Sequence, residues 1–198
     1  MTPRTRAIHA PWREKYLLAM AAAERGVPDG AEADLPAPKG STGCFLRDYW
    51  LAPDQDEPNH VIVRRTDEQA GGAGLGGMIL LNLFPYASGH LLVALGQSRG
   101  RLLEYSPAQR AALWSMVDDA MDLMERALRP QGVNVGLNQG RAAGAGVPEH
   151  AHVHLVPRWH GDVNFMTVVG ETRVIPSSTA GVAARYREAW RARGAAGA

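Results

Sequence analysis

The sequence predicts an α+β domain in which a mostly antiparallel sheet carries a long helix on one face. Three observations favour this class: two short apolar runs joined by a turn, one long segment with helical periodicity, and a later segment in which apolar residues alternate with histidines. Their order along the chain is typical of an antiparallel sheet with helices packed on one side. The chain has 198 residues, of which 45% are apolar, and this suits one globular domain with terminal extensions.

The first 40 residues are predicted to form a helix and a linker ahead of the domain. The helix begins at Pro11 and ends at Gly26, because proline is favoured in the first turn and apolar residues repeat between the two at helical spacing. Residues 27–40 are rich in Pro, Ala, Asp and Gly, which is typical of a surface linker. The apolar run in the helix is short for a signal peptide and no segment reaches transmembrane length, so we expect a cytoplasmic protein without a membrane partner.

The middle of the chain is predicted to contain a helical turn at residues 44–50, a strand at residues 60–64 and a hairpin. The hairpin strands are the apolar runs at residues 78–84 and 90–95. The five residues between them, Pro-Tyr-Ala-Ser-Gly, have the composition of a turn, so the two runs are expected to pair.

The longest helix is predicted to follow Ser106, which caps it, with Pro107 in the first position and Gln109 completing a capping box. It ends at the Arg-Pro-Gln-Gly segment of residues 129–132. Its buried side is expected to consist of apolar residues at helical spacing: Leu113, Trp114, Val117, Met121, Met124 and Leu128. The later elements are expected to be strands at residues 133–137, 150–156 and 165–169, and a last helix at residues 180–193.

Three histidines alternate with small and apolar residues in the predicted strand at residues 150–156. Since successive side chains of a strand point to opposite faces, His150, His152 and His154 would lie in a row on one face. Their neighbours would face the core: Ala151, Val153 and Leu155. Pro157 is expected to end the strand, because it lacks a donor for the ladder.

Three interpretations of the histidine row are open. The rings could decorate an exposed face, but three of the chain's seven histidines within five positions make chance decoration improbable. They could bind zinc, but such sites usually need a further ligand, and the only adjacent carboxylates are Glu149 and Asp162. In the third interpretation the middle imidazole is a nucleophile, and its neighbours set its tautomer and stabilise developing charge. This last interpretation requires neither a metal nor a cofactor, and we expect none.

The loop before the row, residues 138–147, favours the nucleophile. It consists largely of small residues, whose N–H groups can approach an anion closely. The formal net charge of +1 gives no broad field for nucleic acid or an anionic membrane, so an anionic ligand must be recognised locally. The loop and the row together indicate a phosphate held beside a nucleophile.

The His-Ala-His-Val-His-Leu-Val segment resembles the motif of the histidine triad (HIT) family. The resemblance extends to the hairpin at residues 81–93, the glycine loop and the Pro-Arg-Trp-x-Gly-Asp-x-Asn-Phe-Met segment at residues 157–166, and covers roughly residues 43–176. The loop and the last segment are similar to those of the bacterial diadenosine polyphosphate (Ap4A) phosphorylase and hydrolase group of the fragile-histidine-triad branch. The resemblance implies the HIT fold and a sheet that continues across a homodimer.

The resemblance also implies roles for the three histidines. His152 would attack the α-phosphorus of a dinucleoside polyphosphate and form a nucleotidyl-histidine, while His154 would bond the phosphate oxygens or the bridging oxygen. His150 would support the phosphate and the leaving group. An ordinary imidazole pKa of about 6.5 leaves most of His152 as the free base at neutral pH. Its other ring nitrogen must donate to a fixed acceptor, for which we expect a main-chain carbonyl.

The substrate contacts implied by the resemblance come from three places. Asn82 would contact the nucleoside near the sugar and the α-phosphate, and Trp159 would stack on a base or cover the site. His90 matches a family position that is more often structural. The loop would bind phosphate oxygens with side chains and N–H groups of five residues: Asn138, Gln139, Gly144, Gly146 and Val147.

The chain departs from the group's pattern at two positions. Cys44 is the only cysteine where members often have Cys-x-x-Cys, so the structural zinc of such relatives is not expected here. Val147 stands where many members have Ser or Thr, which removes a hydroxyl contact to phosphate. The acceptor of the nucleotidyl group therefore stays open between water, which makes a hydrolase, and inorganic phosphate, which makes a phosphorylase.

We thus expect an N-terminal helix and linker at residues 1–40, a HIT domain at residues 41–178 and a helical tail at residues 179–198. The expected activity is cleavage of dinucleoside polyphosphates by a homodimer that binds no nucleic acid. The alternatives are a nucleoside phosphoramidase of the same family and a nucleotide-binding signalling protein without turnover. A metal-dependent hydrolase is a more distant alternative.

Overall fold

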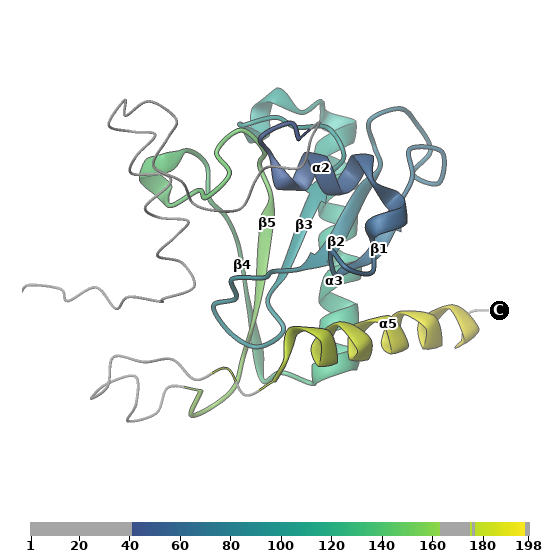
Figure 1. Ribbon diagram of the computed structural model, residues 1–198, viewed down its shortest axis with the longest axis vertical. Coiled ribbons are helices and arrows are strands. Elements are labelled where there is room, and N and C mark those ends of the chain that lie inside the picture. The colour runs from purple at the N-terminus through teal and green to yellow at the C-terminus, as the bar shows by residue number, and fades with distance from the viewer. Residues whose placement is uncertain (1–40, 163–174, 176, 197–198) are drawn as a thin grey trace, which may run out of the picture. The chain divides into compact units, whose positions relative to one another are not determined.

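The computed structural model describes residues 41–162, 175 and 177–196 (Figure 1). The compact unit formed by Ser41–His160 and Ile175–Ala198 contains every helix and strand named below. The helix expected between Pro11 and Gly26 and the strand expected at residues 165–169 lie outside the described residues. The division of the chain at residues 40 and 178 stays a prediction, and the last helix lies in the same compact unit as the sheet.

A five-stranded antiparallel sheet with the strand order β1-β2-β3-β5-β4 forms the centre of this unit. The α+β class with a mostly antiparallel sheet is therefore confirmed. The strands are β1 (Val61–Arg65), β2 (Gly77–Leu81), β3 (Leu91–Leu95), β4 (Gly132–Leu137) and β5 (Val153–Arg158). The hairpin of β2 and β3 pairs Gly77 with Leu95 and Leu81 with Leu91. The turn is longer than expected, because the Asn82 side chain accepts the Phe84 N–H at 2.9 Å and bends the chain directly after β2.

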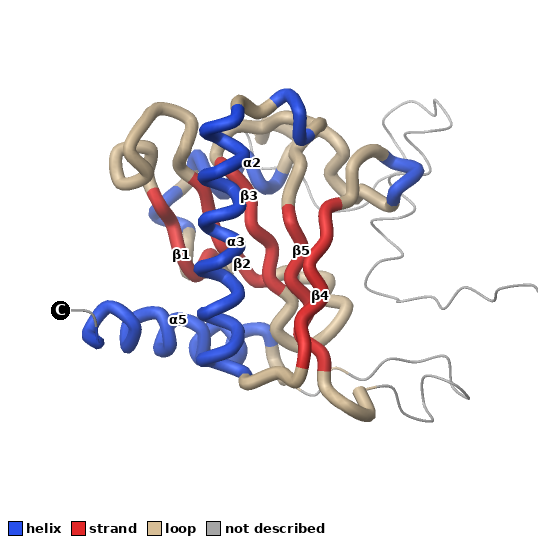
Figure 2. Tube along the Cα trace, turned by 180° about the vertical axis from the view of Figure 1, so that it is seen from behind, coloured by secondary structure: helices blue, strands red, loops and turns tan. Residues whose placement is uncertain are grey.

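The long helix α3 (Pro107–Leu128) lies across one face of the sheet (Figure 2). The predicted capping box is present: the Gln109 N–H donates to Ser106 Oγ at 3.2 Å, and the Ser106 N–H donates to Gln109 Oε1 at 2.9 Å. The predicted core side was wrong at Trp114, which is 44% exposed. The buried stripe of α3 is centred about one residue away from the stripe that the sequence predicts. Trp114 therefore lies outside it, because neighbouring residues on a helix are rotated by about 100°. It consists of Gln109, Leu113, Met116, Val117, Ala120, Leu123 and Met124.

Two further helices flank the sheet. The expected turn near residue 44 is α2 (Phe45–Leu51), and the expected last helix is α5 (Thr179–Ala196), which packs against α3 and β1 (Figure 1). Short 3-10 turns occur at η1 (Pro53–Gln55), η2 (Leu102–Glu104) and η3 (Arg141–Ala143). Within the described part of the chain, no helix combines the length and the apolar character needed to cross a membrane.

Each face of the sheet carries its own hydrophobic cluster. The face under α3 and α5 includes Ala151, Val153 and Leu155, which are buried as the alternating pattern predicts. The opposite face includes Leu46 of α2 and Leu92 of β3. Because His154 is paired with Leu92 across β3 and β5, His154 belongs to this second face.

The strand that carries the histidines differs from its expected bounds at both ends. β5 begins at Val153 rather than at residue 150, so His150 precedes the strand. Pro157 does not end it, because β5 continues to Arg158 and pairs Pro157 with Val133. Proline is tolerated there because β3 pairs with β5 only as far as Leu155, which leaves β5 a partner on one side.

Candidate active site

His152 and His154 lie next to each other, the first directly before β5 and the second in its second position. Their ring centroids are 4.8 Å apart, as expected for residues on one face of a strand. The intervening Val153 is fully buried on the other face, under α3. The structure thus brings together two of the three predicted histidine side chains.

The hydrogen bonds of His152 assign its tautomer. Its Nδ1 atom lies 2.8 Å from the main-chain oxygen of His150. A carbonyl oxygen can only accept, so Nδ1 carries the proton and Nε2 carries the lone pair. Burial lowers the pKa of His152, against the opposing effect of this hydrogen bond, and so favours the neutral ring. The expected main-chain acceptor is therefore present, and Nε2 is the ring nitrogen that carries the lone pair.

The His150 ring is fully buried. Its Nε2 atom lies 2.8 Å from the Leu95 carbonyl oxygen and therefore donates. Its Nδ1 atom lies 3.3 Å from Cys44 Sγ and accepts from the thiol. Burial lowers the pKa of His150 to about 4 and raises the pKa of Cys44, so both groups are neutral at pH 7. Both ring nitrogens are used within the protein, and His150 reaches His152 through its main-chain oxygen.

A second chain of hydrogen bonds runs to His154 through His90, which is fully buried. The Tyr86 N–H and the Asn82 amide nitrogen each lie 3.1 Å from His90 Nδ1. Because a main-chain N–H can only donate, His90 Nδ1 is an acceptor and its proton is on Nε2. That Nε2 atom lies 3.0 Å from His154 Nδ1, which must accept, so a neutral His154 carries its proton on Nε2. His152 and His154 therefore have opposite tautomers: the first presents a lone pair at Nε2, and the second presents an N–H there.

The structure places Asn82 beside His90, at the start of the β2–β3 turn. Its oxygen accepts the Phe84 N–H, and its nitrogen contacts the His90 ring. Tyr86 stacks on the same ring, with centroids 4.9 Å apart and an interplanar angle of 25°. The side chain expected to contact the nucleoside thus also orders the turn that holds His90.

The glycine loop begins directly after β4. Gly140 and Gly144 flank η3 with φ values of 82° and 83°, a region that favours glycine. The Gly144 N–H donates to Arg141 O at 2.9 Å, so this N–H is used inside the loop. The N–H groups of Ala143 and Ala145 are also used inside the loop. Both donate to Gly140 O, the first at 3.2 Å and the second at 3.3 Å.

The two ends of the loop are held against the rest of the site. Gln139 Oε1 accepts the Leu102 N–H at 2.9 Å, so the amide nitrogen of this side chain remains as a donor. At the other end the Val147 side chain is buried with Cys44 and Leu92, and its carbonyl accepts the His150 N–H at 3.2 Å. Among the residues that the structure describes, no acceptor lies within bonding distance of the Val147 N–H. The Asn138 amide lies beside Gly144, 4.0 Å from where a Cβ on that glycine would be.

Trp159 is not brought to the histidine pair within one chain. It follows Arg158, the last residue of β5, whereas His152 precedes the first. A strand rises about 3.3 Å per residue, so the two Cα atoms are separated by about 20 Å. Trp159 is partly exposed at that far end.

Sequence reasoning did not foresee the contact between Cys44 and His150, or the role of Leu95 O as an acceptor. These contacts join residues 106 and 55 positions apart, and no local pattern encodes them. For His90 the sequence contains a signal of a structural role, the Gly-His pair that ends the turn. Its hydrogen bond to His154 could not be predicted from this pair, because the bond depends on the pairing of β3 with β5. Across the described residues, no group of three or more His, Cys, Asp or Glu side chains could hold a metal ion.

Comparison with known proteins agrees with this geometry. Residues 77–161 match the family model of the HIT domain. The chain contains a HIT domain. The solved structures it resembles include a hypothetical histidine triad nucleotide-binding protein from Sulfolobus tokodaii, with a TM-score of 0.56 and 20% identity over 73% of this chain and 92% of that one. A zinc-bound histidine triad family protein from Mycobacterium smegmatis has a TM-score of 0.55 and 22% identity over 77% of this chain and 96% of that one. Both likenesses show that the fold is that of HIT proteins.

The sequence relatives of this chain carry names of enzymes. An AP-4-A phosphorylase of Mycobacterium tuberculosis is 38% identical over 122 residues, which are 61% of this chain and 63% of the relative. An asymmetrical bis(5'-nucleosyl)-tetraphosphatase of Schizosaccharomyces pombe is 33% identical over 82 residues, 41% of this chain and 44% of the relative. The chain thus spans less than two thirds of the length of either relative.

Proposed function

We propose that this HIT protein cleaves dinucleoside polyphosphates of the Ap4A type at the α-phosphate, through a nucleotidyl-histidine on His152. The observation that carries the proposal is the pair of opposite tautomers, a lone pair at His152 Nε2 beside an N–H at His154 Nε2. A phosphoryl centre needs both a nucleophile and a donor for its oxygens. The names of the two sequence relatives, a phosphorylase and a tetraphosphatase, support the substrate class.

In the first step His152 Nε2 forms a bond to the α-phosphorus, and the bond from that phosphorus to the bridging oxygen breaks. The leaving group from Ap4A is ATP, and the enzyme keeps an adenylyl group on His152. The positive charge that develops on the ring is stabilised by the His150 carbonyl oxygen at Nδ1. The N–H of His154 donates to the oxygens of the phosphate or of the leaving group.

In the second step an acceptor attacks the same phosphorus and His152 leaves as the neutral ring. Water yields AMP, and inorganic phosphate yields ADP. We assign His150 a positioning role, since its buried ring fixes the carbonyl that holds His152.

The remaining substrate contacts form part of the same proposal. The Val147 N–H and its neighbour Gly146 would hold oxygens of the α-phosphate, with the positive φ of Gly144 shaping the loop. The free donors of the loop side chains, Asn138 and Gln139, would extend this contact along the polyphosphate. Asn82 would contact the nucleoside from the β2–β3 turn, and Trp159 would contact a base at the far end of β5.

We also propose that two copies pair through β4 and that the protein works in the cytoplasm. β4 is an edge strand, and an edge presents unpaired N–H and C=O groups to a further strand. Val135 is an apolar residue in the middle of β4, and its side chain is 37% exposed in the single chain. A free, buried thiol at Cys44 suits a reducing compartment.

Product analysis tests the proposed activity. The full-length protein is incubated with Ap4A, with and without inorganic phosphate, and the nucleotides are separated by chromatography. ATP with AMP indicates hydrolysis, and ATP with ADP indicates phosphorolysis. Mass spectrometry of acid-sensitive and alkali-stable adducts should locate an adenylyl group on His152. Two ADP molecules from Ap4A without added phosphate, strong inhibition by EDTA, or turnover of an adenosine phosphoramidate but not of Ap4A would overturn the proposal.

A further inference from the structure

Tyr186 connects the last helix to the turn before His90. It lies on α5, outside the residues matched to the HIT domain, and its side chain is fully buried. Its hydroxyl donates to the Gly89 carbonyl oxygen at 2.6 Å, across 97 positions of sequence. Burial raises the pKa of Tyr186, so the hydroxyl keeps its proton and remains a donor.

The peptide between Gly89 and His90 is held from both sides. Tyr186 binds its oxygen, and its N–H, which belongs to His90, donates to Ala87 O at 3.2 Å. Gly89 has a φ of 87°, which favours glycine, and a Cβ there would lie 2.2 Å from Leu128 Cδ1. The orientation of this peptide sets the direction in which the His90 side chain leaves the backbone.

That direction matters because His90 Nε2 contacts His154 Nδ1 at 3.0 Å. A rotated peptide would move the His90 ring and would allow His154 to carry its proton on either nitrogen. We infer that Tyr186 is a positioning residue of the active site: by holding the Gly89–His90 peptide, it keeps the proton of His154 on Nε2. The catalytic consequence rests on the proposed function, whereas the tautomer itself does not.

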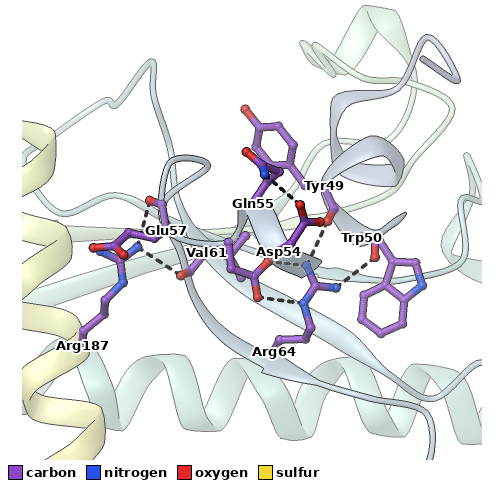
Figure 3. A network of polar contacts seen from close by, with 9 residues as sticks. Tyr49, Trp50, Asp54, Gln55, Glu57, Val61, Arg64 and Arg187 are labelled. Carbon is purple, nitrogen blue, oxygen red and sulfur yellow. Dashed lines mark hydrogen bonds and ion pairs between the residues drawn. The ribbon is translucent and has the colours of Figure 1, made fainter. Parts of the chain in front are cut away.

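Other contacts dock α5 without involving this hydroxyl. Arg187 Nη2 donates to the carbonyl oxygens of Glu57 at 3.2 Å and Val61 at 3.4 Å (Figure 3). Arg193 pairs with Asp119 at 2.7 Å on α3. Removal of the Tyr186 hydroxyl alone should therefore leave the helix in place, and removal of the Arg193 side chain should weaken its docking without touching Gly89.

The test compares Tyr186→Phe with Arg193→Ala in the full chain. Imidazole ¹⁵N NMR, with the His154 signals assigned by a His154→Gln variant, reports the tautomer without any substrate. The native protein and Arg193→Ala should show the Nε2–H tautomer, and Tyr186→Phe should show a mixture. In the Ap4A assay, kcat of Tyr186→Phe should fall about tenfold, the loss equivalent to one hydrogen bond, with KM within about twofold.

The outcomes separate this inference from the proposed function. A native tautomer and native kcat in Tyr186→Phe would overturn the inference, and so would an equal loss in Arg193→Ala, which would show a general effect of helix docking. If the tautomer changes in Tyr186→Phe while the native protein does not turn over Ap4A, the positioning role stands and the proposed activity falls.

Discussion

The Nδ1 atom of His152 lies 2.8 Å from the carbonyl oxygen of His150, two residues earlier in the chain. The strand begins only after these two residues, so this carbonyl is turned toward the ring instead of joining the ladder of β5. The His150 ring is in turn held by Leu95 and Cys44. The His152 ring is thus oriented by the backbone of its neighbour His150, and that backbone is anchored by the buried His150 side chain.

His152→Asn should abolish nucleotide release from Ap4A, by about 10³-fold or more, because it removes the atom that forms the bond to phosphorus. The variant is tested in a single-turnover assay with excess enzyme. His160→Asn is a matched control, since His160 is exposed and follows β5. Turnover in His152→Asn similar to that of the native protein would exclude a covalent role for His152.

The pH dependence of kcat/KM should follow the lowered pKa of His152. Attack requires the neutral ring, and burial lowers its pKa below the ordinary value of about 6.5. Activity should therefore stay level as the pH falls through 6.5 and decline only in more acidic buffer. The measurement is the initial rate of Ap4A loss at low substrate concentration between pH 5 and pH 8. An acidic limb centred above pH 6.5 would be incompatible with this environment of His152.

Stability should decrease in acid because of His150. Its pKa is about 4 in the folded protein and about 6.5 in the unfolded chain, so the unfolded chain binds more protons between these values. The contribution of His150 is present in full above pH 6.5 and is lost as the pH falls toward 4. The loss between pH 7.5 and pH 5 should be about 2 kcal/mol in urea unfolding.

The control for this stability prediction is His150→Gln, which has no group that titrates in this range. The variant should be less stable at neutral pH and should show a smaller difference between pH 7.5 and pH 5. A slope equal to that of the native protein would assign the acid sensitivity to other groups.

Cys44→Ala should destabilise the protein more than Cys44→Ser does. Alanine leaves the buried Nδ1 of His150 without a donor, which costs about 1–3 kcal/mol, whereas a serine hydroxyl can replace the thiol as donor. Thermal unfolding of both variants measures the difference. Equal stability of the alanine and serine variants would show that the thiol contributes by packing alone.

Val135→Lys should dissociate the proposed dimer, since it places a charge in the middle of the exposed edge strand β4. Ser115→Lys is the matched control, because it adds the same charge on the exposed side of α3. Sedimentation velocity should give a dimer for the native protein and the control, and a monomer for Val135→Lys. A native protein that sediments as a monomer would contradict pairing through β4.

Local patterns predicted the elements of this fold correctly where short-range chemistry decides them. The capping box at Ser106 and Gln109 placed the start of α3, and the alternation around Val153 assigned the buried face of β5. Both depend on residues within four positions of one another. The burial of Trp114 was predicted wrongly. The apolar spacing of a helix predicts which side is buried, but the centre of the buried stripe depends on the elements that pack against the helix.

The order of residues alone shows three histidines beside a loop able to approach a phosphate, and it singles out His152 among them. The hydrogen bonds of each ring, in contrast, depend on how the chain folds. The fold places the His150 ring against Cys44. The hydrogen bond from His90 keeps the proton of His154 on Nε2, and Tyr186 holds the peptide before His90. A tautomer follows from the partner of each ring nitrogen, and the partners of the His150 and His154 rings named here lie between 55 and 106 residues away along the chain, beyond the reach of any local pattern.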